Sequence, residues 1–372
     1  MFNLITFYFK TFFKSIKNLI PILLLSFTII GFCIFFNVNR PVSDLDYSMP
    51  PIDTFGTPDE ELQTKLNNFE DEINMSYSEQ DWTTFYDKTI KYYKTALDND
   101  LVSDKNKLIK EIDRYIFLQK GNISFVDEAA HNDALLFLKY LLIEPIVLLI
   151  LVIVLISSSQ IFSSEIENKT YKLLYTQPMS KNKILMSKLL STILINFFII
   201  FSLILLCFLY QCITKNLGSP NFLVKCVVSK EMIYVPLIKY VLYEFALLSI
   251  LIILTCCIGT FISILINNSA ASICVSTVLY GLLYILFKNN PNSLIQKYNP
   301  CAYVDIDRIL SASPVSSLYL IIPRDPSMGR PTESLQHLTN LNLSSGVIFI
   351  IICIVFILFL NTLLINKKRI NN

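Results

Sequence analysis

The chain has 372 residues, of which 53% are hydrophobic and only 16% are charged, and its mean hydropathy is +0.53. A soluble domain of this length does not show such a composition, so the protein is predicted to be integral to a membrane. The formal net charge of +2 hides two regions of opposite sign, because residues 40–140 hold 11 basic and 20 acidic side chains. Eight glycines and two histidines leave little material for a phosphate-binding loop or a histidine-ligated metal site, which argues against most membrane-bound enzymes.

Residues 1–18 predict an amphipathic helix ahead of the first apolar run. Polar side chains fall on one helical face and apolar ones on the other, as expected for an interfacial (elbow) helix on the inner leaflet. The alternative is that this segment extends the first span. The polar face carries Asn3, Thr6, Lys10, Lys14 and Lys17, and the apolar face carries Phe2, Ile5, Phe9, Phe12, Phe13 and Ile16. No cleavage pattern follows the first apolar run, so this run is expected to be retained.

Six apolar runs are long enough to cross a membrane, since a hydrocarbon core of about 30 Å needs about 20 helical residues. The predicted fold class is therefore an all-α integral membrane protein with six transmembrane helices. The predicted spans are residues 19–36, 140–161, 189–212, 237–266, 270–287 and 347–365. The fourth span is long, so we expect it to tilt, to break near Gly259 or to begin outside the membrane.

Clusters of lysine and arginine predict the orientation, because short basic loops stay on the cytoplasmic side. They precede the first span, fill the loop between the second and third spans, and follow the sixth. Both termini and residues 162–188 are therefore predicted to be cytoplasmic, in a cell membrane. The segments predicted to be extracellular are residues 37–139, 213–236 and 288–346, and residues 366–372 form a cytoplasmic tail.

The acidic region between the first two spans predicts a folded helical domain. Thr57-Pro58-Asp59-Glu60 is typical of a helix start, Ser78 and Ser103 are expected to open two more helices, and Gly121 to end the third. Three apolar stripes supply a small core. The stripes are Leu62, Leu66, Phe69 and Ile73; Trp82, Tyr86, Ile90, Tyr93 and Leu97; and Leu108, Ile112 and Ile116.

Ser124 is expected to cap a fourth helix that continues into the second span. Pro145 is the only helix breaker before Ser157, and a proline inside a membrane helix usually kinks the helix without ending it. The pattern predicts a nearly continuous helix that transmits motion between the extracellular domain and residues 162–188. The alternative is that this domain is only a lid or a dimerisation surface.

The stretch from Glu165 to Leu190 carries the most informative pattern. It combines acidic residues, a threonine, two leucines, a proline, a Ser-Lys pair and a later lysine. This pattern resembles the permease subunits of the ABC-2 type exporter family, with Lys169 in place of the usual glycine, and residues 299–305 (NPCAYVD) add a second resemblance. The residues predicted to couple to an ATPase are Glu165, Glu167, Thr170, Tyr171, Leu173, Leu174, Pro178, Ser180, Lys181 and Lys188.

The resemblance implies export, and the apolar spans and aromatic-rich extracellular domain suit an amphipathic or hydrophobic substrate, for which an antimicrobial peptide or a lipid-like compound is our guess. The chain has no G-x-x-x-x-G-K-[ST] motif, so it is not expected to hydrolyse ATP itself. The resemblance implies that a separate cytoplasmic ABC ATPase dimer binds ATP and Mg, docks on residues 165–190, and works with two permease chains, expected to form a homodimer. No cofactor or metal is expected in this chain, and no nucleic-acid partner.

The same loop has a physical interpretation of its own. A helical turn carrying Tyr171, Leu174 and Tyr175 is broken by Pro178 and flanked by lysines, which predicts a compact apolar knob suited to a groove on a soluble partner. The alternative is an interfacial anchor whose leucines enter lipid and whose lysines meet anionic head groups.

Two glutamates interrupt the apolar runs, Glu144 in the second span and Glu244 in the fourth. A carboxylate within a span is a candidate functional group because its burial is costly. Both are expected near the outer interface, where they either reach water and pair with Lys139 and Lys239 or line a candidate substrate path.

An alternative function is a membrane sensor whose extracellular domain binds a ligand and signals inward. A membrane-embedded enzyme is not supported, because the spans hold no convergent His/Asp/Cys cluster. The nine cysteines lie mostly in apolar runs and predict no disulfide framework, although a bridge between Cys226 and Cys301 stays open. Richness in Ile, Asn, Lys and Phe suggests an AT-rich bacterial genome.

Overall fold

The structure, a computed structural model, is mostly helical and contains six helices long and apolar enough to cross a membrane among the residues it describes. The described residues are 2–14, 16–39, 59–102, 105–123, 133–170, 180–228, 231–289, 298–311 and 343–367. The candidate spans are Ile20–Asn37, Glu144–Glu167, Lys181–Thr214, Leu237–Leu265, Ser269–Leu286 and Ser344–Lys367. The prediction of six spans is confirmed.

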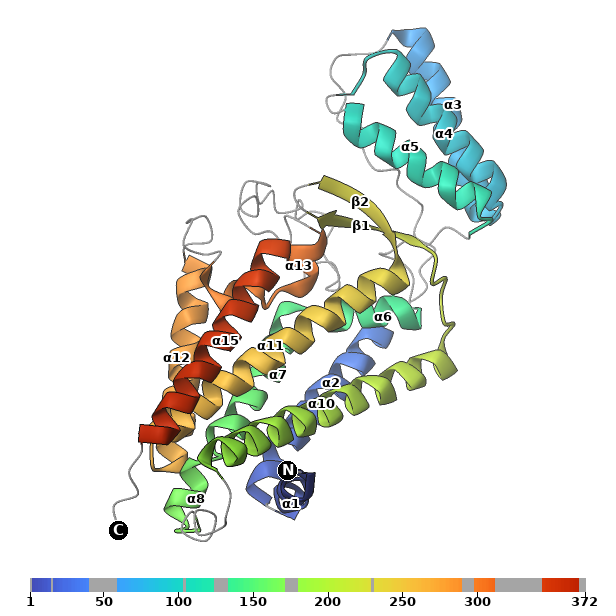
Figure 1. Ribbon diagram of the computed structural model, residues 1–372. Coiled ribbons are helices and arrows are strands. Elements are labelled where there is room, and N and C mark those ends of the chain that lie inside the picture. The colour runs from blue at the N-terminus through green and yellow to red at the C-terminus, as the bar shows by residue number, and fades with distance from the viewer. Residues whose placement is uncertain are drawn as a thin grey trace.

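One helix, α11, forms the centre of the membrane bundle. Its main neighbours are α7 and α15, and Figure 1 shows it running alongside both for most of its length. The bundle helices are α1 (Phe2–Lys14), α2 (Ile16–Asn39), α6 (Ala134–Leu141), α7 (Glu144–Ser159), α8 (Ser163–Glu167), α10 (Lys181–Thr214), α11 (Leu237–Leu265), α12 (Ser269–Asn289) and α15 (Leu343–Lys367). A helix that is apolar on all sides is expected to be buried, and α11 fits that rule.

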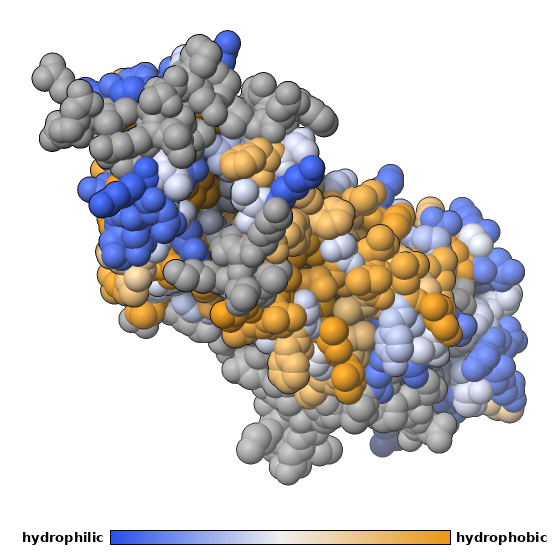
Figure 2. Space-filling model, turned by 90° about the horizontal axis from the view of Figure 1, so that it is seen from below, coloured by the Kyte–Doolittle hydropathy of each residue, from blue (hydrophilic) through white to orange (hydrophobic). Residues whose placement is uncertain are grey.

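The peripheral helices instead expose long apolar side chains. Within this chain, only 17% of the candidate span in α12 and 17% of that in α15 is buried, against 61% of the span in α11. Figure 2 shows hydrophobic side chains over a broad, continuous part of the face in view. A soluble monomer rarely exposes such an area, so the surface suits contact with lipid or with another membrane helix.

Three helices form a separate unit above one end of the bundle, with α4 packed against both α3 and α5 (Figure 1). Its helices are α3 (Glu60–Ser78), α4 (Trp82–Asp98) and α5 (Lys105–Lys120). The predicted stripes form its core: Leu66, Ile73, Tyr86, Ile90, Tyr93, Leu108 and Ile112 are buried, and Leu62, Phe69, Trp82, Leu97 and Ile116 are half-buried. Gly121 directly follows α5, as predicted.

The predicted helix start at Ser78 is wrong. Ser78 is the last residue of α3, and its hydroxyl donates to the Met75 carbonyl. Asp81 caps α4 instead, because its carboxylate accepts hydrogen bonds from both the backbone N–H (3.2 Å) and the hydroxyl (2.6 Å) of Thr84. The other predicted start signals, at Thr57, Pro58 and Ser103, lie outside the described residues.

The predicted continuous helix into the second span is also wrong. The helix α6 ends at Leu141, Ile143 is extended, and α7 begins at Glu144. Pro145 lies in the first turn of α7, where a missing N–H costs no hydrogen bond, so this proline starts a helix and does not kink one. Ser124 lies outside the described residues.

A β-hairpin corrects the all-α prediction. The strands β1 (Leu223–Val228) and β2 (Glu231–Pro236) are antiparallel, with Leu223 opposite Pro236. The predicted extracellular loop over residues 213–236 therefore contains a hairpin. From Leu237 onward, α11 is unbroken through Gly259, so the expected alternative of a break at that glycine does not occur.

Candidate coupling site

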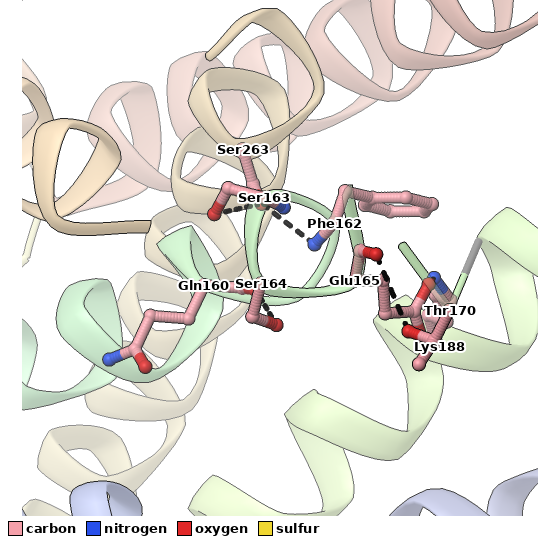
Figure 3. A network of polar contacts seen from close by, with 8 residues as sticks. All are labelled: Gln160, Phe162, Ser163, Ser164, Glu165, Thr170, Lys188 and Ser263. Carbon is pink, nitrogen blue, oxygen red and sulfur yellow. Dashed lines mark hydrogen bonds and ion pairs between the residues drawn. The ribbon is translucent and has the colours of Figure 1, made fainter. Parts of the chain in front are cut away.

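The short helix α8 lies where α7, α10, α11 and α12 meet, at the same end of the bundle as α1 (Figures 1 and 3). The chain leaves α8 through a turn in which the Thr170 backbone N–H donates to the Glu165 carbonyl over 3.0 Å. Lys169 has a φ of 56°, in the left-handed region that glycine adopts without strain. This geometry gives a physical reason for a glycine at the position where this chain has lysine.

A serine of α11 holds the beginning of α8. The backbone N–H groups of Phe162 and Ser163 both donate to Ser263 Oγ, over 2.8 and 3.0 Å, and Ser263 is fully buried. The first N–H groups of a helix have no acceptor within that helix. A hydroxyl from a neighbouring span supplies the acceptor here, so α8 is tied to α11.

An ion pair connects α8 to α10. Lys188 of α10 is 2% exposed, and its ammonium is paired with the Glu165 carboxylate. The ammonium also lies 4.0 Å from the centre of the Phe162 ring and 5.7 Å from that of Tyr8 in α1. A buried lysine is expensive unless its charge is compensated, so these contacts make α8, α10 and α1 depend on one another.

A third contact joins α8 to α12. The Glu167 carboxylate accepts hydrogen bonds from the backbone N–H (3.1 Å) and the hydroxyl (2.5 Å) of Ser269, the first residue of α12. A carboxylate at a helix N-terminus is favourable because it satisfies orphan donors and faces the positive end of the helix dipole. We call the contacts of α8 with Lys188, Ser263 and Ser269 the α8 joint.

Small side chains bring α7 and α11 close together beside the α8 joint. A Cβ added to Gly259 would lie 1.9 Å from Ser158 Oγ, so only glycine fits there without movement. The Ser272 hydroxyl of α12 donates to the Ser159 carbonyl over 2.7 Å. Close backbone approach at small residues is a common way for membrane helices to pack.

The structure brings together some of the residues predicted to couple to an ATPase. Glu165, Glu167 and Lys188 belong to the α8 joint, and Thr170 hydrogen-bonds back to α8. Ser180 caps α10 by accepting a 3.4 Å hydrogen bond from the Lys183 N–H, with Lys181 as the first residue of that helix. Tyr171, Leu173, Leu174 and Pro178, like Tyr175, lie outside the described residues.

Sequence reasoning missed Phe162, Ser263 and Ser269. Serines are frequent in these spans, and the bond between Ser163 and Ser263 joins residues 100 positions apart. No local pattern distinguishes Ser263 from the other serines, so only the packing of α7 against α11 identifies it.

The two intramembrane glutamates lie near the opposite end of the bundle. Glu144 accepts a hydrogen bond from the Tyr284 hydroxyl, and Glu244 is fully buried in α11. Lys139 is buried too, with its ammonium 5.5 Å from the centre of the Tyr240 ring, one helical turn before Glu244. The expectation that Glu244 reaches water is therefore wrong, because this side chain is fully buried in α11, against which both α6 and α7 pack.

The open question of a bridge between Cys226 and Cys301 has a simple structural answer. Both residues are buried thiols and neither takes part in a disulfide. Cys301 instead contacts the Tyr280 carbonyl, with 3.9 Å between sulfur and oxygen.

Comparison with known proteins identifies the family to which the chain is similar. Residues 9–363 match the family model described as ABC-2 family transporter protein. No curated protein and no solved structure matches the chain. Permeases of this family are transmembrane subunits that lack an ATPase domain and pair with an ATPase subunit. With six candidate spans and a match over nearly its whole length, the chain belongs to the ABC-2 family as a membrane permease.

Proposed function

We propose that this permease forms the membrane part of an ATP-driven exporter, and that α8 and the residues following it receive the movement of a separate ATPase subunit. The observation that carries the proposal is the α8 joint, in which a five-residue helix is bonded to three different spans. A displacement of α8 acts on α10, α11 and α12 at once, because each of them holds a different part of it.

The orientation we propose places α8 and both termini in the cytoplasm and the three-helix unit and hairpin outside the cell. Lys169, Lys181 and Lys183 lie on the α8 side of the bundle, and short basic segments stay cytoplasmic. The bacterial cell membrane is the proposed location. On this orientation α8 is within reach of a soluble ATPase.

The proposed substrate is an amphipathic or hydrophobic compound, with an antimicrobial peptide or a lipid-like molecule as our guess. Two copies of the chain would form the path as a homodimer, with ATP and Mg held by the ATPase partner. Glu144 and Glu244 are candidates for that path, because carboxylates in apolar spans are costly to keep without a function.

The proposed ATPase contact is tested by Leu174→Asp. Burying even an unpaired neutral polar group in an apolar contact costs about 2–7 kcal/mol, and an unpaired carboxylate costs more, so the ATPase should no longer co-purify with the permease. The matched control is Asn68→Asp, which adds the same charge at an exposed residue of α3, outside the proposed contact. Stoichiometric binding by the Leu174 variant, with normal membrane insertion, would contradict the proposed contact.

The proposed orientation is tested by labelling intact cells with a membrane-impermeant thiol reagent. Asn99 and Asn182 are both exposed in the structure, so each accepts a cysteine without disturbing the core. Asn99→Cys should react from outside and Asn182→Cys only after lysis. The reverse result would place α8 outside the cell and exclude a cytoplasmic ATPase contact.

A further inference from the structure

The three-helix unit contacts the hairpin through one turn of α5. The Arg114 guanidinium lies 5.3 Å from the centre of the Phe222 ring and 5.2 Å from that of the Tyr234 ring. The Tyr234 hydroxyl donates to the Glu111 carboxylate, which also lies 3.5 Å from the Arg114 guanidinium. We call this cluster of four residues the hairpin joint.

The chemistry of the hairpin joint fixes the position of α5 on the hairpin. A guanidinium over an aromatic ring is attracted by the ring quadrupole, and the Arg114 guanidinium has two such rings within reach. Phe222 is fully buried, and burial together with the Glu111 charge raises the pKa of Tyr234 above its usual value, so its hydroxyl keeps its proton. The hydroxyl therefore remains a donor to Glu111 throughout the physiological pH range.

The hairpin in turn continues directly into α11. Pro236 ends β2 and is the N-cap of α11, which begins at Leu237. The first two N–H groups of α11 donate to the carbonyls of Phe222 (2.7 Å) and Pro220 (3.2 Å), which precede β1. Because Phe222, a member of the hairpin joint, satisfies the first of these orphan donors, the joint and the beginning of α11 are expected to move together.

The other end of α11 belongs to the α8 joint. The helix has 29 residues, a length of about 44 Å at 1.5 Å per residue, and its Ser263 holds the start of α8. The route through α6 and α7 is interrupted at Ile143, whereas α11 is continuous from Leu237 to Leu265. A continuous helix transmits displacement along its axis better than two helices joined by an extended residue.

We infer that α11 couples the three-helix unit to α8, with Arg114 as the positioning residue at the hairpin joint and Ser263 at the α8 joint. The role of α8 as the receiver of ATPase movement rests on the proposed function, but the coupling between the two joints does not. A substitution that weakens the contacts of one joint weakens those of the other. The effect is reciprocal because it is a coupling free energy between two sites.

The test measures hydrogen–deuterium exchange in the purified full-length permease in lipid nanodiscs, without any ATPase. Arg114→Ala should speed amide exchange at Phe162 and Ser163 by about fivefold, the lower range of typical couplings. Ser263→Ala should in turn speed exchange in the hairpin, residues 222–236. The matched control is Asp113→Ala, an exposed neighbour of Arg114 in α5, which should change neither.

Two outcomes would overturn the inference. In the first, Arg114→Ala speeds exchange in the hairpin but leaves Phe162 and Ser163 as in the control, so the joint opens without any effect at α8. In the second, Arg114→Ala leaves the hairpin itself unchanged, so Arg114 does not fix its position. Arg114→Lys, which keeps the charge but not the planar stacking, gives a milder perturbation if the alanine variant does not fold, and it is judged by the same two criteria.

A second measurement separates this inference from the proposed function. In the complex with a co-purified ATPase, Arg114→Ala should change the rate of basal ATP hydrolysis, whereas Asp113→Ala should leave it unchanged. If no ATPase co-purifies with the unmodified permease, the proposed function fails while the exchange result still decides the coupling. If an ATPase binds and its activity ignores Arg114→Ala while exchange at Phe162 and Ser163 changes, the coupling between the joints stands and the proposed role of α8 as receiver of the ATPase movement is contradicted.

Discussion

The two ends of α11 are held by different kinds of contact. At the α8 joint, the Ser263 hydroxyl and a buried ion pair make short polar contacts among apolar helices. At the hairpin joint, a guanidinium rests on two aromatic rings, and both Arg114 and Tyr234 are half-buried. Polar contacts, as at the α8 joint, are strongest where water is excluded. Contacts between a guanidinium and an aromatic ring, as at the hairpin joint, still stabilise where water has access. The α8 joint should therefore be the more sensitive to loss of a single polar group.

The largest effect is expected from Lys188→Met, which would leave the half-buried Glu165 carboxylate without its cation. Breaking a buried ion pair in this way costs about 3–5 kcal/mol, so the unfolding temperature of the purified permease should fall sharply. The double variant Lys188→Met with Glu165→Leu removes both charges and should recover most of the loss. If the double variant is as unstable as the single one, the ion pair is not what stabilises the α8 joint.

A smaller effect is expected from Gly259→Ala, which tests the close packing of α7 and α11 beside the α8 joint. The new methyl group would meet Ser158 Oγ at 1.9 Å, and overpacking of this kind costs about 1–3 kcal/mol.

Gly281→Ala in α12 is the matched control for Gly259→Ala. A Cβ at Gly281 has no neighbour within 4 Å, so this change should be neutral or stabilise the helix by about 0.5–1 kcal/mol. Thermal unfolding in detergent compares the two alanine variants directly. Equal stability of both would show that α7 and α11 are not packed as tightly as described.

The smallest effect is expected at the hairpin joint, from Tyr234→Phe. The ring remains stacked on Arg114 and only the hydrogen bond to Glu111 is lost, so the change should cost about 0.5–1.5 kcal/mol near neutral pH.

The pH dependence of this variant isolates Tyr234. Because the folded-state pKa of Tyr234 is raised, its contribution to stability is complete below the unfolded pKa of about 10 and is lost as the pH rises above that value. Between neutral pH and pH values above about 10, the free energy of unfolding should therefore fall less steeply with pH for Tyr234→Phe than for the unmodified protein. Identical slopes would show that the Tyr234 hydroxyl does not govern this joint.

Local patterns were sufficient for much of the fold. Six spans follow from run length and hydropathy, and the core of the three-helix unit follows from stripes such as Leu66 with Ile73. These features depend on periodicity within one helix, which neighbouring residues encode. The family resemblance also rested on a contiguous stretch, and the match over residues 9–363 confirms it.

The same local reasoning failed where two signals competed. Ser78 and Asp81 both suit a helix start, and the carboxylate prevailed because it accepts two hydrogen bonds from Thr84. Pro145 suits a kink or a beginning, and it became a beginning because Ile143 is extended. A sequence pattern shows that both structures are compatible with the local residues, but it does not select one of them.

Composition, run length and a short motif suffice to identify this chain as a membrane permease with a helical insertion, because each of them can be read from neighbouring residues. Helix packing determines which residues hold α8 and places the three-helix unit on the hairpin that leads into α11. Ser263 and Phe162 are separated by 101 positions, and Tyr234 and Glu111 by 123, so no local pattern joins them. Such pairs meet only when whole helices pack, which is why α11, and not the helix predicted from Ser124 into the second span, connects the two ends of the protein.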